Sequence, residues 1–275
     1  SEMCIRDRFG GSKPINSWFT VGSLPITASQ ALEYSSNTYM VQLALKMMGQ
    51  DYYPGMTLTT SGMKKTMSAL RAAYAEFGMG GPTGIDLPGE STGYLTDNYT
   101  VSNVLTESFG QFDNYTTMQL AQYVATIANG GNRLAPHIVQ GIYEDDGSQG
   151  PGQLSKAIET SILNKVQLSG DQLAIIQDGF YQVVNSGSAY ATGRALAGGP
   201  ITISAKTGTA ETYATDKNGQ TLATYNLNVV AYGPSADADI AVAVMYPHAT
   251  NSLAKAQQLI AKDMITLYMT MYGNQ

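Results

Sequence analysis

The stretch Ile201-Thr202-Ile203-Ser204-Ala205-Lys206-Thr207-Gly208-Thr209 decides the fold. Its first six residues alternate apolar and polar side chains, which is the period of a β-strand with one buried face. Two further strands are predicted at 227–232 and 239–246, and Asn218-Gly219 is a strong hairpin turn signal. Three consecutive strands joined by short turns predict an antiparallel meander.

A helix at the end of the chain supplies the layer that such a sheet needs. Asn251 or Ser252 is expected to cap this helix. Apolar residues then recur on one face at helical spacing: Leu253, Ala256, Ile260, Met264, Leu267 and Met271. We expect that stripe to be buried on the sheet. The predicted fold class is therefore α+β, with an antiparallel sheet flanked by helices in one domain.

Helical patterns also occupy much of the chain before the meander. Helices are predicted at 27–34, 38–48, 64–77 and 118–128, and from a capping box at Ser169-Gly170-Asp171-Gln172 to near Gly187. Residues 144–160 are rich in glycine and scattered charge, so they are expected to form an exposed connection.

Composition narrows the classes of function. The 275 residues carry a net charge of −6, from 21 acidic and 15 basic side chains, whereas a nucleic-acid binder needs a basic surface. The two histidines and one cysteine, Cys4, are too few for a His/Cys metal cage or an intrachain disulfide. We therefore expect no nucleic-acid partner and no such metal site.

The first eight residues differ in style from the rest of the chain. They hold four charged residues and the single cysteine, and the sequence does not begin with methionine. We expect residues 1–8 to be a non-native or disordered tail. Residues 9–275 are expected to be one domain whose N-terminal part is absent.

Lys206-Thr207-Gly208-Thr209 is a candidate binding segment at the end of the first strand. A lysine on a largely apolar strand loses hydration unless it gains a partner, and the two threonines beside it would make a patch for a carboxylate. Gly208 lets another backbone approach, so an extended peptide could pair with the strand edge. The Thr209 N–H would then face a developing oxyanion. Alone, this segment also fits a surface turn.

Ser35-Ser36-Asn37 is a second candidate, in the joint between two predicted helices. A hydroxyl there can relay a proton, and an amide can hold a substrate carbonyl or orient an amine. The alternative is helix capping, because serine and asparagine are preferred N-cap residues.

Together the two segments resemble the Ser-x-Asn and Lys-Thr-Gly motifs of penicillin-binding proteins, in the family order. Longer stretches are similar to the class B penicillin-binding proteins, the monofunctional transpeptidases: Ala31-Leu32-Glu33-Tyr34-Ser35-Ser36-Asn37-Thr38-Tyr39-Met40, Thr83-Gly84-Ile85-Asp86-Leu87-Pro88-Gly89-Glu90 and Phe109-Gly110-Gln111. Val229-Val230-Ala231-Tyr232-Gly233-Pro234-Ser235-Ala236-Asp237 most resembles the 2B type of Gram-positive cocci. The resemblance covers about residues 10–272 and implies a serine β-lactamase/penicillin-binding transpeptidase-like fold.

The resemblance implies acyl transfer on peptidoglycan stem peptides that end in D-Ala-D-Ala, through an acyl-serine ester, with β-lactam antibiotics as mimics of the acyl donor. It implies proton relay by Ser35, substrate amide binding by Asn37 and positive charge near the terminal carboxylate from Lys206. Thr207 and Thr209 would bind that carboxylate. No metal or organic cofactor is implied.

The same resemblance places the protein at the extracytoplasmic face of the cell membrane. Cell-wall elongation or division proteins are the further partners that it implies.

One family motif is not found before Ser35. The family nucleophile lies in Ser-x-x-Lys upstream of Ser-x-Asn, whereas Ser61-Gly62-Met63-Lys64 follows Ser35 in a loop that enters a helix. We therefore expect the nucleophilic serine in a missing region, and we expect this chain alone to be inactive.

Three other functions stay open. A class A β-lactamase needs a glutamate with an asparagine four residues later, and Glu33 and Asn37 have that spacing, although Asn37 already belongs to Ser-x-Asn. A D,D-carboxypeptidase is chemically close to a transpeptidase and is separated from it only by resemblance. The alternative outside enzymes is a non-catalytic, penicillin-recognising scaffold module.

Overall fold

A three-stranded antiparallel sheet forms the centre of the molecule. The computed structural model describes residues 2–3, 6–7, 15–19, 24–145, 147 and 150–273. The strands β9 (Ser204–Thr215), β10 (Thr221–Gly233) and β11 (Ile240–Ala249) lie in the order β11-β10-β9, so the predicted meander is confirmed. β9 begins at Ser204 rather than Ile201, because the Thr202 carbonyl accepts the Ser235 N–H of the β10–β11 turn instead of a ladder bond.

The turn between β9 and β10 is fixed by side-chain chemistry. The Asp216 carboxylate accepts the backbone N–H groups of Asn218 and Gln220, and Gly219 adopts a φ of 78°, where a Cβ would be strained. The predicted Asn-Gly turn is therefore confirmed.

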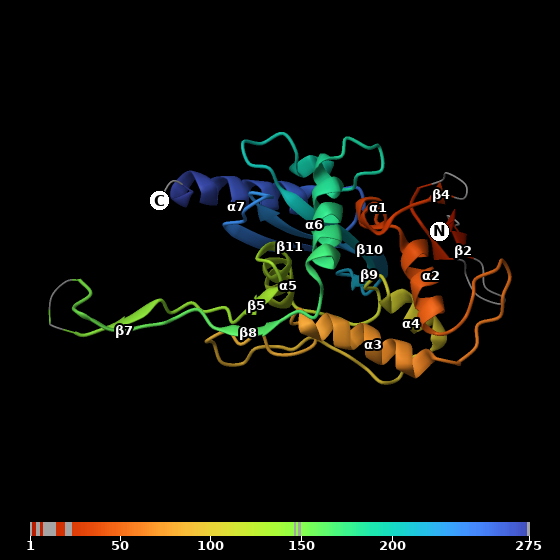
Figure 1. Ribbon diagram of the computed structural model, residues 1–275, viewed down its shortest axis with the longest axis horizontal. Helices are drawn as coiled ribbons and strands as arrows, with labels where there is room; N and C mark the ends of the chain where they lie inside the picture. Colours follow the sequence, from red (N-terminus) through yellow and green to blue (C-terminus); the bar gives the residue numbers. More distant parts are fainter. Residues whose placement is uncertain are drawn as a thin grey trace.

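Helices cover both faces of this sheet (Figure 1). They are α5 (Thr117–Ala128) and α6 (Gly170–Asn185) on one side and α7 (Ala256–Tyr272) on the other. Alternate residues of β10 serve the two layers: Val230 and Tyr232 pack with Phe180 of α6, whereas Val229 and Ala231 pack against α7. The α+β prediction is confirmed.

The apolar stripe of α7, which was predicted to be buried on the sheet, faces outward instead. Ala261 and Ile265 contact the sheet and are fully buried. The predicted stripe is 46–75% exposed at Leu253, Ile260, Met264, Leu267 and Met271. Apolar residues lie on two faces of this helix, so periodicity alone does not say which face is buried, and the sheet takes the face with the small alanine.

The predicted cap of α7 is also wrong. The N-cap is Lys255, which makes no side-chain capping bond. The side-chain oxygen of Asn251 accepts the Leu253 N–H, which closes a local turn before the helix begins.

The remaining described helices pack beside the sheet. They are α1 (Ala28–Glu33), α2 (Asn37–Met47), α3 (Met63–Glu76), α4 (Val101–Glu107) and the 3-10 turn η1 (Arg194–Leu196). The predicted helices among these, and those of α5 and α6, agree with the observed ones to within two residues at each end, whereas α7 begins at Ala256, later than the predicted cap at Asn251 or Ser252 implies. The seven-residue α4 was not predicted, although Thr100 and Asn103 form a reciprocal cap at its start.

A two-stranded ribbon projects from the molecule (Figure 1). It is built by the pairs β5 (Asn132–Leu134) with β8 (Ile162–Lys165) and β6 (Gly141–Tyr143) with β7 (Leu154–Ala157). The connection predicted at 144–160 is therefore exposed, as expected, but partly paired.

Two short pairs lie near the start of the chain. β1 (Glu2–Met3) pairs with β4 (Leu24–Pro25), and β2 (Arg6–Asp7) pairs with β3 (Ile15–Asn16). Cys4 lies outside the described residues. Among the helices that the structure describes, none combines the length and hydropathy of a bilayer span.

The two faces of α7 give a direct test of its orientation. We expect Ile265→Ala to lower the free energy of unfolding by about 2–5 kcal/mol, because it opens a cavity against the sheet. Leu267→Ala on the exposed face should change it by no more than about 0.5 kcal/mol. Urea denaturation of both variants measures this, and a larger loss for Leu267→Ala would contradict the orientation.

Candidate active site

The two predicted motifs meet at one cleft. Lys206 Nζ donates a 2.7 Å hydrogen bond to Ser35 Oγ, although the two residues are 171 positions apart, and a second 2.7 Å bond to the Thr207 carbonyl. Ser35, Asn37 and the segment 206–209 all line a cleft of about 720 Å³. The structure therefore brings together the two segments that the sequence singled out as candidate sites.

Helix capping falls on the middle residue of Ser35-Ser36-Asn37. Ser36 is the N-cap of α2, and its hydroxyl accepts the Tyr39 N–H. Ser36 is also buried beside the Ser17 hydroxyl, 3.2 Å away. All three residues border the cleft, but because the Ser36 hydroxyl caps the helix, Ser35 and Asn37 are the two not used for capping.

Ser35 is held in an uncommon backbone conformation. Its φ is 52°, in the left-handed region that side chains other than glycine rarely adopt. The preceding carbonyl, of Tyr34, accepts a 2.6 Å hydrogen bond from the Trp18 indole, and the Tyr34 ring packs edge-on against Tyr190 at 5.2 Å. These contacts fix the joint between α1 and α2, which aims the Ser35 hydroxyl at Lys206.

Asn37 opens α2 at the same cleft. Its side-chain amide donates a 3.3 Å hydrogen bond to the Asn16 carbonyl. The bond uses one of the two amide donors, so the second donor and the carbonyl oxygen can still bind another group.

Burial makes Lys206 an unusual lysine. Desolvation lowers its pKa from the ordinary 10.5 to about 8. The lowered pKa brings the neutral amine, which can accept a proton from a neighbouring hydroxyl, closer to neutral pH.

β9 presents a free edge to the cleft. It lies at the end of the described sheet, and the carbonyl groups of Thr207 and Thr209 accept hydrogen bonds from the side chains of Lys206 and Gln111. The N–H and C=O groups of one residue in an antiparallel strand point the same way, so the Thr209 N–H also faces this edge.

Thr207 and Gly208, in the same segment, are consistent with an open strand edge. The Thr207 hydroxyl donates to the Thr192 hydroxyl at 2.9 Å. A Cβ added at Gly208 would meet the Asn228 side chain at 3.6 Å, an ordinary contact, so packing inside the chain does not require glycine there.

Several cleft residues were missed from the sequence. Gln111 donates a 3.2 Å hydrogen bond to the Thr209 carbonyl, Thr192 supports Thr207, and Trp18 lies on the rim. Trp18 could have been singled out as the one tryptophan of the chain. Thr192 carries no local signal, because only the fold brings it to β9.

A second Ser-x-x-Lys sequence was also passed over. Ser252-Leu253-Ala254-Lys255 lines the cleft, and a search for the pattern would have found it. It forms the turn before α7, and Ser61 likewise precedes α3, whose N-cap Gly62 is left-handed. Neither pair stands one turn apart on a helix, where residues three apart are neighbours.

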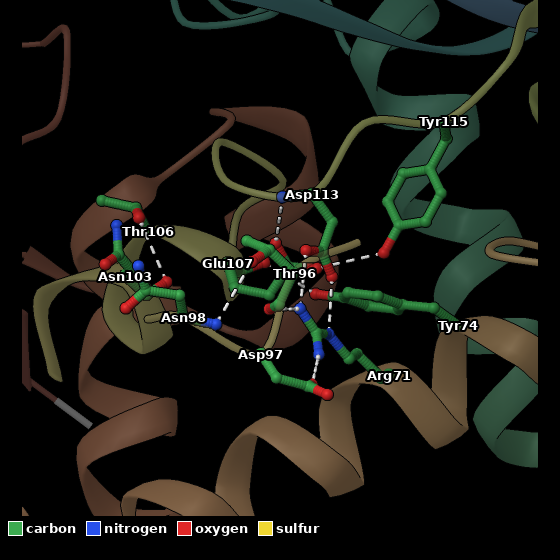
Figure 2. A network of polar contacts seen from close by, with 10 residues as sticks. All are labelled: Arg71, Tyr74, Thr96, Asp97, Asn98, Asn103, Thr106, Glu107, Asp113 and Tyr115. Carbon is green, nitrogen blue, oxygen red and sulfur yellow. Dashed lines mark hydrogen bonds and ion pairs between the residues drawn. The ribbon is translucent and has the colours of Figure 1, made fainter. Parts of the chain in front are cut away.

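A buried polar network holds the loop that carries Gln111 (Figure 2). Arg71 donates to both carboxylate oxygens of Asp113, at 2.7 and 2.8 Å, and to the exposed Asp97. Glu107 accepts the Asp113 N–H at 2.9 Å and the Tyr115 hydroxyl at 3.2 Å. Burial raises the pKa of Glu107, and its two donors oppose that shift.

A family comparison identifies this arrangement. The model described as the Penicillin binding protein transpeptidase domain matches residues 4–266. The chain belongs to the penicillin-binding transpeptidase family. The match begins within the first eight residues, so the predicted boundary at residue 9 stays a prediction. Across the described residues, no cluster of three metal-ligating side chains is present.

Known relatives support the membership of this transpeptidase domain. It is 52% identical to penicillin-binding protein 2B of Streptococcus pneumoniae, over 94% of this chain and 38% of that protein. It is 39% identical to penicillin-binding protein H of Bacillus subtilis, over 86% and 33%. The solved structure of the Streptococcus pneumoniae protein aligns with a TM-score of 0.92 and 51% identity, over 98% of this chain and 44% of that chain. The chain thus spans less than half the length of these relatives.

The lowered pKa of Lys206 can be measured directly. In a pH titration followed by NMR of isotope-labelled lysine side chains, one resonance should titrate near pH 8, while exposed lysines titrate near 10.4. Lys206→Met should remove that resonance and no other. Titration of all lysines near 10.4 would contradict the desolvation of this amine.

The Arg71–Asp113 pair should matter far more than its exposed neighbour. The Asp113 side chain is 1% exposed, so Asp113→Ala should cost about 2–4 kcal/mol by leaving the guanidinium without its buried partner. Asp97→Ala, at a fully exposed carboxylate, should cost at most about 0.5 kcal/mol. Denaturant unfolding compares the two, and equal losses would argue against the network.

Proposed function

We propose that this chain is the C-terminal part of a peptidoglycan D,D-transpeptidase. The observation that carries the proposal is the 2.7 Å bond from Lys206 to Ser35, in a cleft bordered by the free edge of β9. A hydroxyl joined to a partly neutral amine, beside an open strand edge, suits acyl transfer on an extended peptide.

The acyl donor would bind as a further strand on β9. In an antiparallel pair one residue exchanges both of its backbone bonds with one partner residue. Thr209 would therefore accept the N–H of the penultimate D-Ala and donate its own N–H to the carbonyl of that residue. That N–H would stabilise the oxyanion formed on attack.

The terminal carboxylate of the donor would lie beside Lys206, Thr207 and Thr209. The Thr207 hydroxyl now donates to Thr192, and both are hydroxyl groups. Thr192 can therefore rotate to donate to Thr207, which frees the Thr207 proton for the carboxylate.

The reaction would run in two acyl transfers. A serine hydroxyl gives its proton to the lysine of its own Ser-x-x-Lys motif and attacks the penultimate carbonyl, the bond to the terminal D-Ala breaks, and an acyl-serine ester remains. Ser35, hydrogen-bonded to Lys206, would pass a proton to the leaving amine. An amine of a second stem peptide then attacks the ester, its proton passes to the serine oxygen, and the serine is released while Asn37 holds the donor amide.

The nucleophilic Ser-x-x-Lys would lie in a segment of the protein that precedes this chain. Two surfaces support this proposal: among the described strands β11 ends the sheet without a neighbour, and α7 exposes its apolar stripe beside it. A preceding segment could cover both. The protein would act at the extracytoplasmic face of the membrane, bind β-lactam antibiotics as donor mimics, and work with cell-wall elongation or division proteins.

The β-lactamase alternative is disfavoured by the position of Glu33. Its carboxylate is buried and accepts the Ser186 hydroxyl at 2.6 Å, at the contact between α1 and α6. A glutamate that activates water has to face the substrate.

Covalent labelling tests the proposal. We expect a fluorescent penicillin to form a stable adduct with the full-length protein and none with residues 1–275, because the nucleophile is outside this stretch. An adduct on this chain would contradict that placement. Ser252→Ala and Ser61→Ala variants would then show which serine had reacted.

Product analysis separates the enzyme classes. The full-length protein should release D-Ala from a stem pentapeptide and form cross-linked product when an acceptor amine is added. Release that does not depend on any acceptor would indicate a carboxypeptidase, and no release at all would indicate a recognition module.

A further inference from the structure

We propose that Gln111 sets how strongly the cleft discriminates between acyl donors with and without an amide N–H at the Thr209 carbonyl. The inference rests on the proposed function, because it concerns the strand edge where the donor would add. Gln111 Nε2 occupies this carbonyl at 3.2 Å.

Both outward carbonyls of β9 at the cleft have internal donors. Lys206 covers the Thr207 carbonyl at 2.7 Å, and Gln111 covers the Thr209 carbonyl. A strand edge with its acceptors satisfied in this way does not have to be paired or hydrated.

The two covering donors differ in how readily they can leave. Lys206 is a charged group in a partly buried position, so its hydrogen bond is short and costly to break. Gln111 is neutral and exposed, and its bond is longer. A donor peptide would therefore displace Gln111 and leave Lys206 in place.

The loop that presents Gln111 is clamped at both ends. Its ends are Glu107, at the close of α4, and Asp113, and the two are joined by the bond from the Asp113 N–H to the Glu107 carboxylate. Arg71 grips Asp113 from α3 (Figure 2). Between these ends Ser108, Phe109, Gly110 and Gln111 line the cleft. The loop thus holds the glutamine beside β9, so its amide is available whenever the carbonyl lacks another donor.

Two kinds of ligand would meet this amide differently. A ligand with an N–H at that position replaces Gln111 and pays for the lost bond. A ligand without the N–H leaves Gln111 in place. The Thr209 carbonyl then keeps its hydrogen bond and is not buried without a partner. Gln111 thus weakens binding of the first ligand, supports binding of the second, and lowers the ratio between their affinities.

The test compares two matched peptides. One is an acetylated tripeptide ending in D-Ala-D-Ala, and the other has an ester oxygen in place of the N–H of the penultimate D-Ala. Their Kd values are measured by titration calorimetry on this chain and on the full-length protein. In Gln111→Ala, the affinity ratio of amide over ester peptide should rise about 3- to 10-fold, the factor given by one net hydrogen bond.

Two further variants isolate the cause. Gln111→Glu keeps the size of the side chain but cannot donate a hydrogen bond, so it should raise the affinity ratio of amide over ester peptide as Gln111→Ala does. Its negative charge acts on both peptides alike and cancels in that ratio. Gln220→Ala, an exposed glutamine in the β9–β10 turn, should leave both Kd values unchanged.

The outcomes distinguish the two proposals. An unchanged ratio in Gln111→Ala, with the amide peptide still bound, would overturn the role of Gln111 alone. Failure of the amide peptide to bind this chain and the full-length protein would overturn the donor site and, with it, this inference. A fall in the ratio would also overturn it, because Gln111 would then assist the amide ligand.

Discussion

A desolvated ammonium group joins the two parts of the molecule that make the cleft. Lys206 extends from β9 to the Ser35 hydroxyl in the joint between α1 and α2, and the burial that this requires lowers its pKa to about 8. The same burial makes the amine useful, because an ordinary lysine would be fully protonated at neutral pH. Geometry, electrostatics and the suggested proton relay therefore depend on one contact.

The rest of the site holds Ser35 and Lys206 in position for that contact. Ser36 takes over the capping of α2, which leaves Ser35 to adopt its left-handed backbone and face the lysine. On the opposite side, the clamp between Arg71 and Asp113 holds the loop that bears Gln111 against β9. The reactive groups thus lie on rigid supports, although two of the three segments that carry them are loops or turns.

The sequence predicted the sheet and the main helices correctly. It failed where one sequence pattern was compatible with two structures. The meander, the main helices and the choice of Ser35 and Lys206 as site residues were predicted, because alternation, caps and family motifs are local signals. The buried face of α7 was wrong, since both faces are apolar and only the sheet selects Ile265 over Leu267. Gln111 lay in a family-like stretch but was given no role, and Thr192 could not be found, because only the fold brings these residues to β9.

The uncovered border of the sheet has a consequence for the behaviour of the isolated polypeptide. Pro247 and an irregularity of register interrupt the last part of β11, which discourages pairing there. Ahead of them β11 is regular, pairs with no further strand among the described residues, and lies next to the exposed apolar face of α7. Such a border is a template for adding copies of the same polypeptide edge to edge, so colloidal stability depends on whatever shields it.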